Sequence, residues 1–364
     1  MPKCNTALSK AIIKRKSEMA TCSVIILNWN GAAMLRKFLP SVLKYTNDSD
    51  YEVIVADNGS TDNSIDAVQE INTSALTKGI APARIFPFET NLGFAAGYNQ
   101  AISQVDSEYV VLLNSDVEVT PNWLEPIISY MDRHPEVAAC QPKILSWKAK
   151  EEGKQLFEHA GAAGGHIDYL GYPYCRGRIM DYIEEDKGQY NTIDTCFWAS
   201  GACMCIRAEV YEEVGGLDEA FFAHMEEIDL CWRLNARSWW VACIPQSKVY
   251  HVGGASLNYG NPRKTFLNFR NNLLMIYKNA STKHMWFALC VRVCLDYVAA
   301  LNDLLHGRFA NAWAIVRARF AFLFSIHKFY AKRKENLQHT TVTDMLTISR
   351  RSIIWDYFVK HKTK

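Results

Sequence analysis

Acidic and amide side chains follow an apolar run at residues 112–118, which read Leu-Leu-Asn-Ser-Asp-Val-Glu. Oxygen ligands at the end of a buried strand suit Mg²⁺ or Mn²⁺, and such an ion can hold a diphosphate. If the strand continues, Asn114, Asp116 and Glu118 share one of its faces. The alternative interpretation is a strand that ends in solvated acids and binds nothing.

Two other segments could contact a ligand. Asp57 follows the apolar residues 52–56 and could accept hydrogen bonds from a nucleobase or a ribose, or it could simply open a turn through Asn58 and Gly59. The segment 91–99 (NLGFAAGYN) combines small residues, which let a backbone approach a ligand, with asparagine at both ends. It could equally be a glycine-rich loop that opens an ordinary helix.

An acidic cluster, Glu226-Glu227-Ile-Asp229, begins a predicted helix. A carboxylate beside a cleft can act as the general base for an attacking hydroxyl. Acids in a first helical turn also favour the helix dipole, so a purely structural role is the alternative. Asp229 lies one turn before Arg233 and is assigned to structure more readily than Glu227.

A histidine, His251, follows an apolar run and precedes two glycines separated from it by one valine. In that setting it could bind a metal or contact a phosphate. On chemistry alone, a structural histidine with satisfied hydrogen bonds is the favoured interpretation.

The elements that position these side chains alternate between strand and helix. Continuous apolar runs with β-branched residues predict buried parallel strands, and helical spacing of apolar residues predicts the helices between them. The expected strands are 22–29, 52–56, 83–87 and 109–113, and the expected helices are 31–45 and 94–104. This order predicts a doubly wound α/β sheet, whose ligands bind beyond the carboxyl ends of the strands, where these polar residues lie.

The second half of the chain changes in character. Residues 155–195 are rich in Gly, Tyr and charge and predict a long loop region with short strands, before an acidic helix at 225–237 and a strand at 240–244. Residues 265–330 predict an amphipathic helix pair. Its most apolar part, 285–305, is interrupted by charged residues, so we expect it to lie on a membrane surface or to pack on the catalytic domain, and not to span a bilayer. Those interruptions are Arg292, Asp296 and Asp303.

The composition is that of a folded protein, with 49% hydrophobic and 21% charged residues among 364. A net charge of +2 gives no indication of a nucleic-acid partner. The eleven cysteines include no CxxC pair, so we expect reduced, buried thiols in a cytosolic protein and no structural zinc. Residues 1–20 carry a basic cluster and are expected to form a loosely ordered extension.

Eight segments in order resemble glycosyltransferase family 2, in its rhamnosyltransferase-like and galactofuranosyltransferase-like branch. The resemblance covers about residues 22–280, and several of its motifs are specific in both composition and spacing. The segments are VIILNWNG at 24–31, VADNGSTD at 55–62, NLGFAAGYN at 91–99, LLNSDVEV at 112–119, ASGACMCIR at 199–207, GGLDEAFF at 215–222, EEIDLCWR at 226–233 and VYHVGGAS at 249–256.

This resemblance implies a GT-A fold and a nucleoside-diphosphate sugar as donor, with UDP- or dTDP-sugars expected. Asn114-Ser115-Asp116 takes the place of the family's DXD motif, and Asn114 in place of an acid leaves one ligand neutral. Glu227 stands at the position of the catalytic base, beside Glu226, where the family has an aspartate. The implied donor-binding residues are Asn28, Asn30, Asp57, Asn91, Gly93, Gly97, Asn114 and Ser115; the implied ligands of Mg²⁺ or Mn²⁺ are Asp116, His251 and Asn114; and the implied acceptor side includes Trp198 and Gly201.

The implied reaction is a metal-assisted, inverting transfer of a sugar to a hydroxyl of a saccharide or a lipid-linked glycan. The expected organisation is a basic extension over 1–20, a GT-A catalytic domain over 21–262 and a helical region over 263–364, in the cytoplasm or at the cytoplasmic face of the inner membrane. The C-terminal helices would contact the membrane or form a homodimer. The alternatives are a nucleotidyltransferase and a degenerate transferase domain that only binds.

Overall fold

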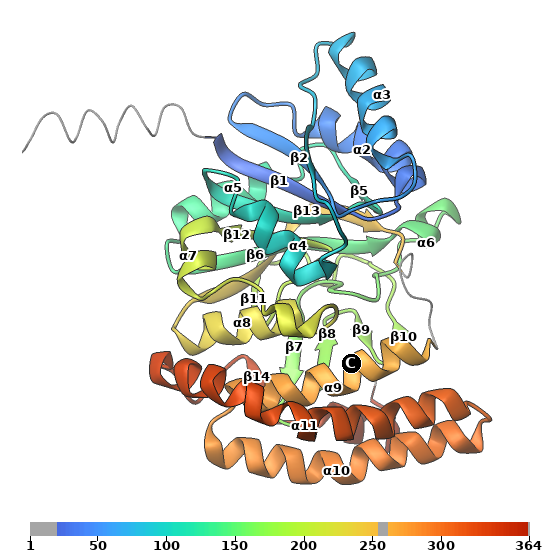
Figure 1. Ribbon diagram of the computed structural model, residues 1–364, viewed down its shortest axis with the longest axis vertical. Coiled ribbons are helices and arrows are strands. Elements are labelled where there is room, and N and C mark those ends of the chain that lie inside the picture. Colours follow the sequence, from blue (N-terminus) through green and yellow to red (C-terminus); the bar gives the residue numbers. More distant parts are fainter. Residues whose placement is uncertain (1–19, 254–260, 363–364) are drawn as a thin grey trace, which may run out of the picture.

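The computed structural model describes residues 20–253 and 261–362 (Figure 1). The basic extension and the last three residues of the predicted motif at 249–256 lie outside these ranges. In the first half of the chain, all four predicted strands and both predicted helices are confirmed. The elements are β1 Ala20–Asn28, α2 Ala32–Tyr45, β2 Tyr51–Asp57, α3 Ser64–Leu76, β3 Arg84–Pro87, α4 Gly93–Ile102 and β4 Ser107–Asn114.

The strands of this half are parallel and end level with one another. Asn28 at the end of β1 is paired with Asp57 at the end of β2, and Leu27 is paired with Asn114 of β4. The register therefore brings three of the predicted ligand-binding side chains to one edge of the sheet, as expected for the carboxyl ends of parallel strands.

The main sheet has nine strands and is mixed. Its order is β11-β13-β6-β12-β4-β1-β2-β3, with β5 paired to β13, and β12 runs antiparallel to both of its neighbours. The second-half elements of this layer are β5 Val117–Val119, α5 Glu125–Arg133, β6 Val137–Ser146, α6 Trp147–Glu151, β11 Asp194–Cys196, β12 Cys203–Arg207, α7 Ala208–Glu213, the short 3₁₀ helix η1 Glu219–Phe221, α8 Glu226–Ala236 and β13 Trp240–His251.

The strand expected at 240–244 is longer than its sequence pattern indicates. β13 runs on to His251 across a register shift between Ile244 and Lys248. Pro245 lies within this shift and cannot donate a ladder hydrogen bond, so it hides the continuation of the strand from pattern reading. The extra length matters because it carries His251 to the same edge as the ends of β1, β2 and β4.

Helices cover both faces of the sheet, which explains why its central strands are apolar throughout. On one face, Val24 and Ile26 of β1 pack with α2, α3 and α5; on the other, Ile25 packs with the layer that holds α4, α7 and α8. Because successive side chains of a strand point to opposite faces, both residue sets are buried.

A second, smaller sheet lies below the main one, in the region predicted to be loops with short strands. It comprises β7 Gly165–Asp168, β8 Pro173–Cys175, β9 Arg178–Ile179, β10 Tyr182–Ile183 and β14 Ile348–Ser349, the last of these from the C-terminal region.

The C-terminal region contains three long helices, so the expectation of a pair is wrong. They are α9 Pro262–Asn279, α10 Thr282–Leu305 and α11 Phe309–His339, followed by the short α12 Ile353–Phe358. The sequence pattern missed the break at residues 280–281. Figure 1 shows α9 next to α8 and α10 at the far end of the molecule. The expectation of uniformly buried thiols is also wrong, because Cys290 and Cys294 of α10 are exposed.

A buried network of charges joins α8 to α9. The Lys278 ammonium of α9 lies 2.6 Å from an oxygen of Asp218 and 2.8 Å from Asp229 of α8, and Arg233 binds the same Asp229 oxygen at 3.0 Å. Asn279 donates to the other oxygen of Asp229 at 2.7 Å. Asp229 is fully buried, and these contacts all bind it to neighbouring side chains. They support the interpretation that Asp229 has a structural role.

We predict that Lys278→Met strongly destabilises the fold. The substitution leaves two buried carboxylates without their shared cation, and breaking a buried ion pair in this way costs about 3–5 kcal/mol. The free energy of unfolding, measured by urea denaturation, should fall by that amount. In the matched control Arg36→Met, the lost ion pair with Glu70 is exposed, so the change should stay below about 1 kcal/mol. Equal effects of the two substitutions would contradict the prediction.

Candidate active site

The first strand and the second strand are tied together at their ends. The Asn28 amide donates to Asp57 Oδ1 at 2.9 Å and to Ser60 Oγ at 3.2 Å, while Ser60 donates its hydroxyl back to Asp57 at 2.6 Å. Asn30, in a left-handed conformation, accepts the Thr61 amide at 2.7 Å. The residues of these two loops that are predicted to bind the sugar donor are therefore held together by hydrogen bonds before any ligand binds.

Part of this constellation lacks an internal partner. The amide oxygen of Asn28 is buried and accepts no hydrogen bond from the described residues. A Cβ added at Gly31 would lie 2.3 Å from that oxygen and 3.5 Å from Ser115 Oγ, so the glycine leaves room beside both predicted donor residues. An unpaired buried acceptor of this kind is costly unless a ligand or water satisfies it.

The glycine-rich segment has a different geometry from the one expected of a free ligand loop. Asn91 accepts the Gly93 amide at 2.8 Å and the Asn58 side chain at 3.2 Å. Gly97 lies against Leu27 of β1, where a Cβ would come within 2.9 Å of the leucine methyls. In this structure, Gly97 lets α4 pack closely on the sheet, and Asn91 fixes the turn that leads into α4.

A chain of three ionisable side chains lies beside the end of β4. His251 Nε2 is 3.1 Å from Asp116 Oδ1, and His251 Nδ1 is 3.3 Å from Glu158 Oε2, with all three residues buried. Asn114 contributes its amide 3.5 Å from His251 Nε2. The structure thus brings together Asn114, Asp116 and His251, and adds Glu158.

The expectation that Glu118 shares this face is wrong. Its two oxygens accept from Trp147 Nε1 at 2.9 Å and from Lys150 at 2.7 Å. The chain turns at Ser115 and Asp116 before β5 begins, so β4 does not continue as one strand and the face alternation is broken.

The two carboxylates hold His251 in its charged form in this metal-free arrangement. Burial acts to lower the pKa of His251, but hydrogen bonding and charge from Asp116 and Glu158 raise it to about 10. Burial acts to raise the pKa of Glu158, and the opposing contacts with His251 and the Ala160 amide lower it to about 2. A proton on the imidazole therefore balances the negative charge of this cluster.

These residues fit a divalent cation that also binds a phosphate ligand. Within 20–253 and 261–362, no three His, Cys, Asp or Glu side chains converge as a complete ligand set. Ions such as Mg²⁺, however, commonly use one or two protein ligands and take the rest from substrate phosphates. The 3.1 Å between Asp116 Oδ1 and His251 Nε2 matches the spacing of about 3 Å between adjacent ligands of such an ion.

The acidic pair at the start of α8 is enclosed and unpaired. One oxygen each of Glu226 and Glu227 is buried without a hydrogen-bond partner among the described residues, although the Glu227 side chain as a whole is partly exposed. Burial raises the pKa of Glu227 to about 7. Burial and the neighbouring Glu227 charge raise the pKa of Glu226 further above its ordinary range. A carboxyl that titrates near neutrality is suited to proton transfer.

The loop before this pair is strained and clamped. Phe222, His224 and Met225 all have positive φ, at 64°, 69° and 74°. The fully buried Asn271 of α9 donates its side-chain amide to three carbonyls of this loop at 2.8–3.0 Å. Such conformations persist only where surrounding contacts impose them, so α9 determines where Glu227 lies.

The two predicted acceptor-side residues differ in their surroundings. A Cβ at Gly201 would lie 3.8 Å from Glu227 Cβ and 3.0 Å from Phe94, so this glycine borders the acidic pair. Trp198 is buried under β7, donates its indole N–H to the His166 carbonyl at 2.9 Å and packs against Gly165.

Sequence reasoning missed Glu158 and Asn271. Glu158 falls in the segment without periodicity, 93 positions before its partner His251, and only the acidic residue itself could have drawn notice. Asn271 had a signal: together with Asn272, it places an amide pair inside an apolar helical pattern, where a buried polar group needs partners.

Comparison with known proteins agrees with the sequence motifs. The profile described as "Glycosyl transferase family 2" matches residues 23–215. The chain is 30% identical over 240 residues to the O-antigen biosynthesis protein RfbC of Myxococcus xanthus, covering 64% of this chain but only 17% of that protein. It is 25% identical over 244 residues to the N-acetylglucosaminyl-diphospho-decaprenol L-rhamnosyltransferase of Mycobacterium tuberculosis, covering 63% of this chain and 75% of the relative.

Solved structures share the fold at low sequence identity. GalNAc-T7, crystallised with UDP, GalNAc and Mn²⁺, has a TM-score of 0.56 at 16% identity, covering 73% of this chain and 49% of that one. The mannosyltransferase PcManGT of Pyrobaculum calidifontis, in complex with GDP-Man and Mn²⁺, has a TM-score of 0.50 at 13% identity and covers 92% of both chains. Because the family profile spans more than half of the sequence, the chain belongs to glycosyltransferase family 2, with the GT-A fold and a C-terminal helical extension.

Proposed function

We propose that this glycosyltransferase transfers a sugar from a nucleoside diphosphate to an acceptor hydroxyl with inversion, assisted by a divalent cation, and with Glu227 as general base. The observation that carries the proposal is the enclosed Glu227 carboxyl, one oxygen of which is buried without a hydrogen-bond partner in the part of the chain that the structure describes. Its pKa of about 7 and its position beside Gly201 suit it to receive a proton. The neighbouring Glu226 is also buried, with one oxygen unpaired among the described residues, but we assign it no role as a nucleophile, so the proposed route is a single displacement and not a retaining one.

On the donor side, the Asn28–Asp57–Ser60 constellation would bind the nucleoside, with Asn30 and Ser115 beside it. Asp116 and His251, with Asn114, would hold Mg²⁺ or Mn²⁺ against the diphosphate. When bound, the cation would stabilise negative charge on the departing diphosphate. We propose a UDP- or dTDP-sugar as donor, because both supply the pyrimidine, pentose and diphosphate groups that these side chains would contact.

On the acceptor side, the hydroxyl would lie between Glu227 and the anomeric carbon. Glu227 takes the hydroxyl proton as the oxygen attacks, the bond to the diphosphate breaks, and the nucleoside diphosphate leaves with the bonding electrons. Attack opposite the leaving group inverts the anomeric centre. The relative that acts on N-acetylglucosaminyl-diphospho-decaprenol supports a lipid-linked glycan as acceptor, and hence work at the cytoplasmic face of the membrane for cell-surface polysaccharide synthesis.

We predict that Glu227→Gln abolishes sugar transfer and leaves nucleotide binding intact. The amide has the size of the carboxylate but cannot take a proton, so the rate should fall at least about 100-fold. Activity should be measured as nucleoside diphosphate release, and binding by the thermal shift with UDP or dTDP and Mn²⁺. The control Glu118→Gln alters an acid that is bound by Trp147 and Lys150 and should keep most of its activity.

The same assignment requires a pH profile. Because burial raises the Glu227 pKa to about 7, the ionised base is lost below that pH and accumulates above it. The logarithm of the transfer rate, plotted against pH, should therefore rise with a slope of one and level off above about pH 7. A flat profile between pH 5.5 and 8.5, or full activity of Glu227→Gln, would overturn the base assignment.

We predict that Mn²⁺ binding releases about one proton near pH 8. In the metal-free chain, Asp116 and Glu158 raise the His251 pKa to about 10, and the nitrogen must be deprotonated to bind a metal. Affinity should rise about tenfold for each pH unit from 7 to 9. Titration calorimetry in buffers of different ionisation enthalpy measures the proton count. The substitution His251→Gln should remove this proton release. A Mn²⁺ affinity that does not depend on pH would refute His251 as a ligand.

We predict that Asn271→Leu lowers kcat about 10- to 100-fold, because small displacements of a catalytic group carry losses of that size. Nucleotide affinity should change little, since the Asn271 side chain bonds to the loop before Glu227 and to the neighbouring Arg270, and to none of the proposed donor-binding residues. Asn268→Leu, the same change at a partly exposed position of α9, is the control. A loss of nucleotide affinity equal to the loss in kcat would indicate general unfolding and would contradict a positioning role.

A further inference from the structure

The outer helix α10 exposes many of its large apolar residues and buries an ion pair in its middle. From Trp286 to Leu305, the exposed positions recur at helical spacing and include no charged residue. Three of its large apolar side chains, Trp286, Val298 and Leu305, are 61%, 63% and 77% exposed. The other large apolar side chains exposed on this helix are Phe287, Val293, Tyr297, Leu301 and Leu304.

Two charged residues in the middle of α10 face the rest of the protein. Arg292 is 2% exposed and pairs with Asp296, itself 3% exposed, at 3.0 Å. The Arg292 guanidinium also donates to Asn272 of α9 and lies 3.9 Å from the centre of the Tyr172 ring. These contacts fix the orientation of α10, so its apolar face cannot turn inward without breaking a buried ion pair.

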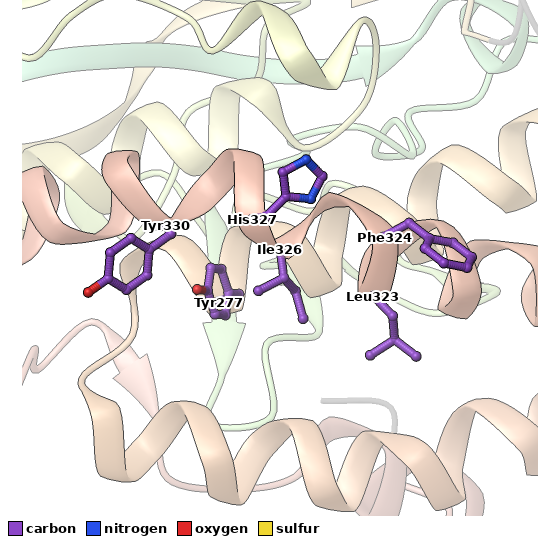
Figure 2. A pocket seen from close by; sticks show the side chains of 6 residues that line it. All are labelled: Tyr277, Leu323, Phe324, Ile326, His327 and Tyr330. Atoms are coloured by element: carbon purple, nitrogen blue, oxygen red, sulfur yellow. The ribbon is translucent and has the colours of Figure 1, made fainter.

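The neighbouring α11 extends the same surface. Phe309, Trp313, Phe320 and Phe324 are all more than half exposed. A shallow apolar hollow of about 590 Å³ opens here, lined by side chains of α9 and α11, and Figure 2 shows their arrangement. Its lining residues are Tyr277, Leu323, Phe324, Ile326, His327 and Tyr330. None of them belongs to the candidate active site.

The balance of charged residues also changes where the C-terminal helices begin. Residues 263–364 contain 18 Lys and Arg but only 5 Asp and Glu, whereas residues 1–262 contain 22 and 33. The near-neutral total therefore conceals a strongly basic helical region on an acidic catalytic half. Exposed cations on α10 and α11, including Lys283, Arg317 and Lys328, lie among the exposed apolar side chains in sequence. Basic and aromatic residues together are typical of surfaces that bind anionic lipid.

We propose that the exposed apolar face of α10 and α11, here called the lipid face, docks flat on a bilayer that contains anionic lipids. Both helices are long and apolar enough to cross a membrane by length and composition alone. A crossing of α10 would place the Arg292–Asp296 pair in the hydrocarbon core and strip its contacts with α9, whereas in-plane docking keeps them.

The charge distribution selects lipid over a second copy of the chain. In a two-fold dimer the same face meets itself, so the basic region would oppose another basic region. Anionic head groups neutralise these cations, and the acidic catalytic half is repelled from the same surface and turned away from it. This proposal does not depend on which reaction the enzyme performs.

The test is co-sedimentation of the purified full chain with vesicles. Phosphatidylglycerol–phosphatidylethanolamine vesicles should bind the protein, and pure phosphatidylcholine vesicles should bind it at least about tenfold more weakly. Raising the salt concentration from 50 to 500 mM should weaken binding to the anionic vesicles, because salt screens the attraction between the exposed cations and the lipid head groups. A bimane label on the exposed Cys290 should shift to the blue on binding.

Two sets of variants separate the contributions. Trp286→Ser/Val298→Ser/Leu305→Ser changes exposed side chains only, so it should keep the melting temperature and lose at least about tenfold in binding. Lys283→Glu/Arg317→Glu/Lys328→Glu should lose binding to anionic vesicles alone. The control, Leu76→Ser/Ile193→Ser/Trp240→Ser, removes exposed apolar side chains from outside the C-terminal helices and should bind as the parent does.

Three outcomes would overturn the proposal. The first is no binding to anionic vesicles, and the second is equal binding by the parent and the serine variant of the lipid face. The third is a homodimer in light scattering that this variant dissociates, with no lipid binding by the parent, because the face would then be covered by a second copy.

Discussion

The buried ammonium of Lys278 is the interaction on which the placement of Glu227 depends. It lies between Asp218, in the segment before α8, and Asp229, within α8, and so holds both ends of the strained loop that leads to Glu227. Burying three charges is costly unless each is neutralised at short range, which restricts α8 and α9 to one relative position. Asn271, two turns earlier on α9, then holds the carbonyls of the loop. The proposed base, Glu227, is therefore positioned from outside the main sheet.

A similar balance of charge operates where β4 and β13 end. Asp116 and Glu158 place two negative charges on one imidazole, and in the metal-free chain a proton compensates them. A cation bound at Asp116 and His251 would take over that compensation, with Glu158 left to orient the ring through Nδ1. At Glu227, burial raises the pKa of the carboxyl to about 7, with no opposing ion pair among the described residues. The two sites use opposite environments for the same chemical group.

The parts of the site that could be predicted from sequence are those encoded locally. Asn28, Asp57 and Asn114 each end an apolar strand, and parallel pairing brings strand ends together whatever the rest of the fold does. Glu158 and Asn271 act through partners 93 and about 47–50 positions away, which no local pattern reveals. The misplacement of Glu118 and the short prediction for β13 have a related cause. A turn at Ser115 and a bulge at Pro245 interrupt the two-residue period on which such predictions rest.

The C-terminal helices connect Glu227, the proposed base, to the outer surface of α10. Helical periodicity alone would place some of the connecting side chains in water, although they are buried. Read as an amphipathic pattern, α10 would turn Arg292 and Asp296 to water, yet both are buried and its apolar residues are exposed. The inversion is possible because α9 supplies partners: Asn272 accepts from Arg292, and the adjacent Asn271 holds the loop before Glu227. Two neighbouring amides of one helix thus face opposite neighbours, α10 and the base loop. A surface to which α10 docks would consequently have a fixed orientation relative to the Glu227 carboxylate, because the contacts that join them through α9 are buried.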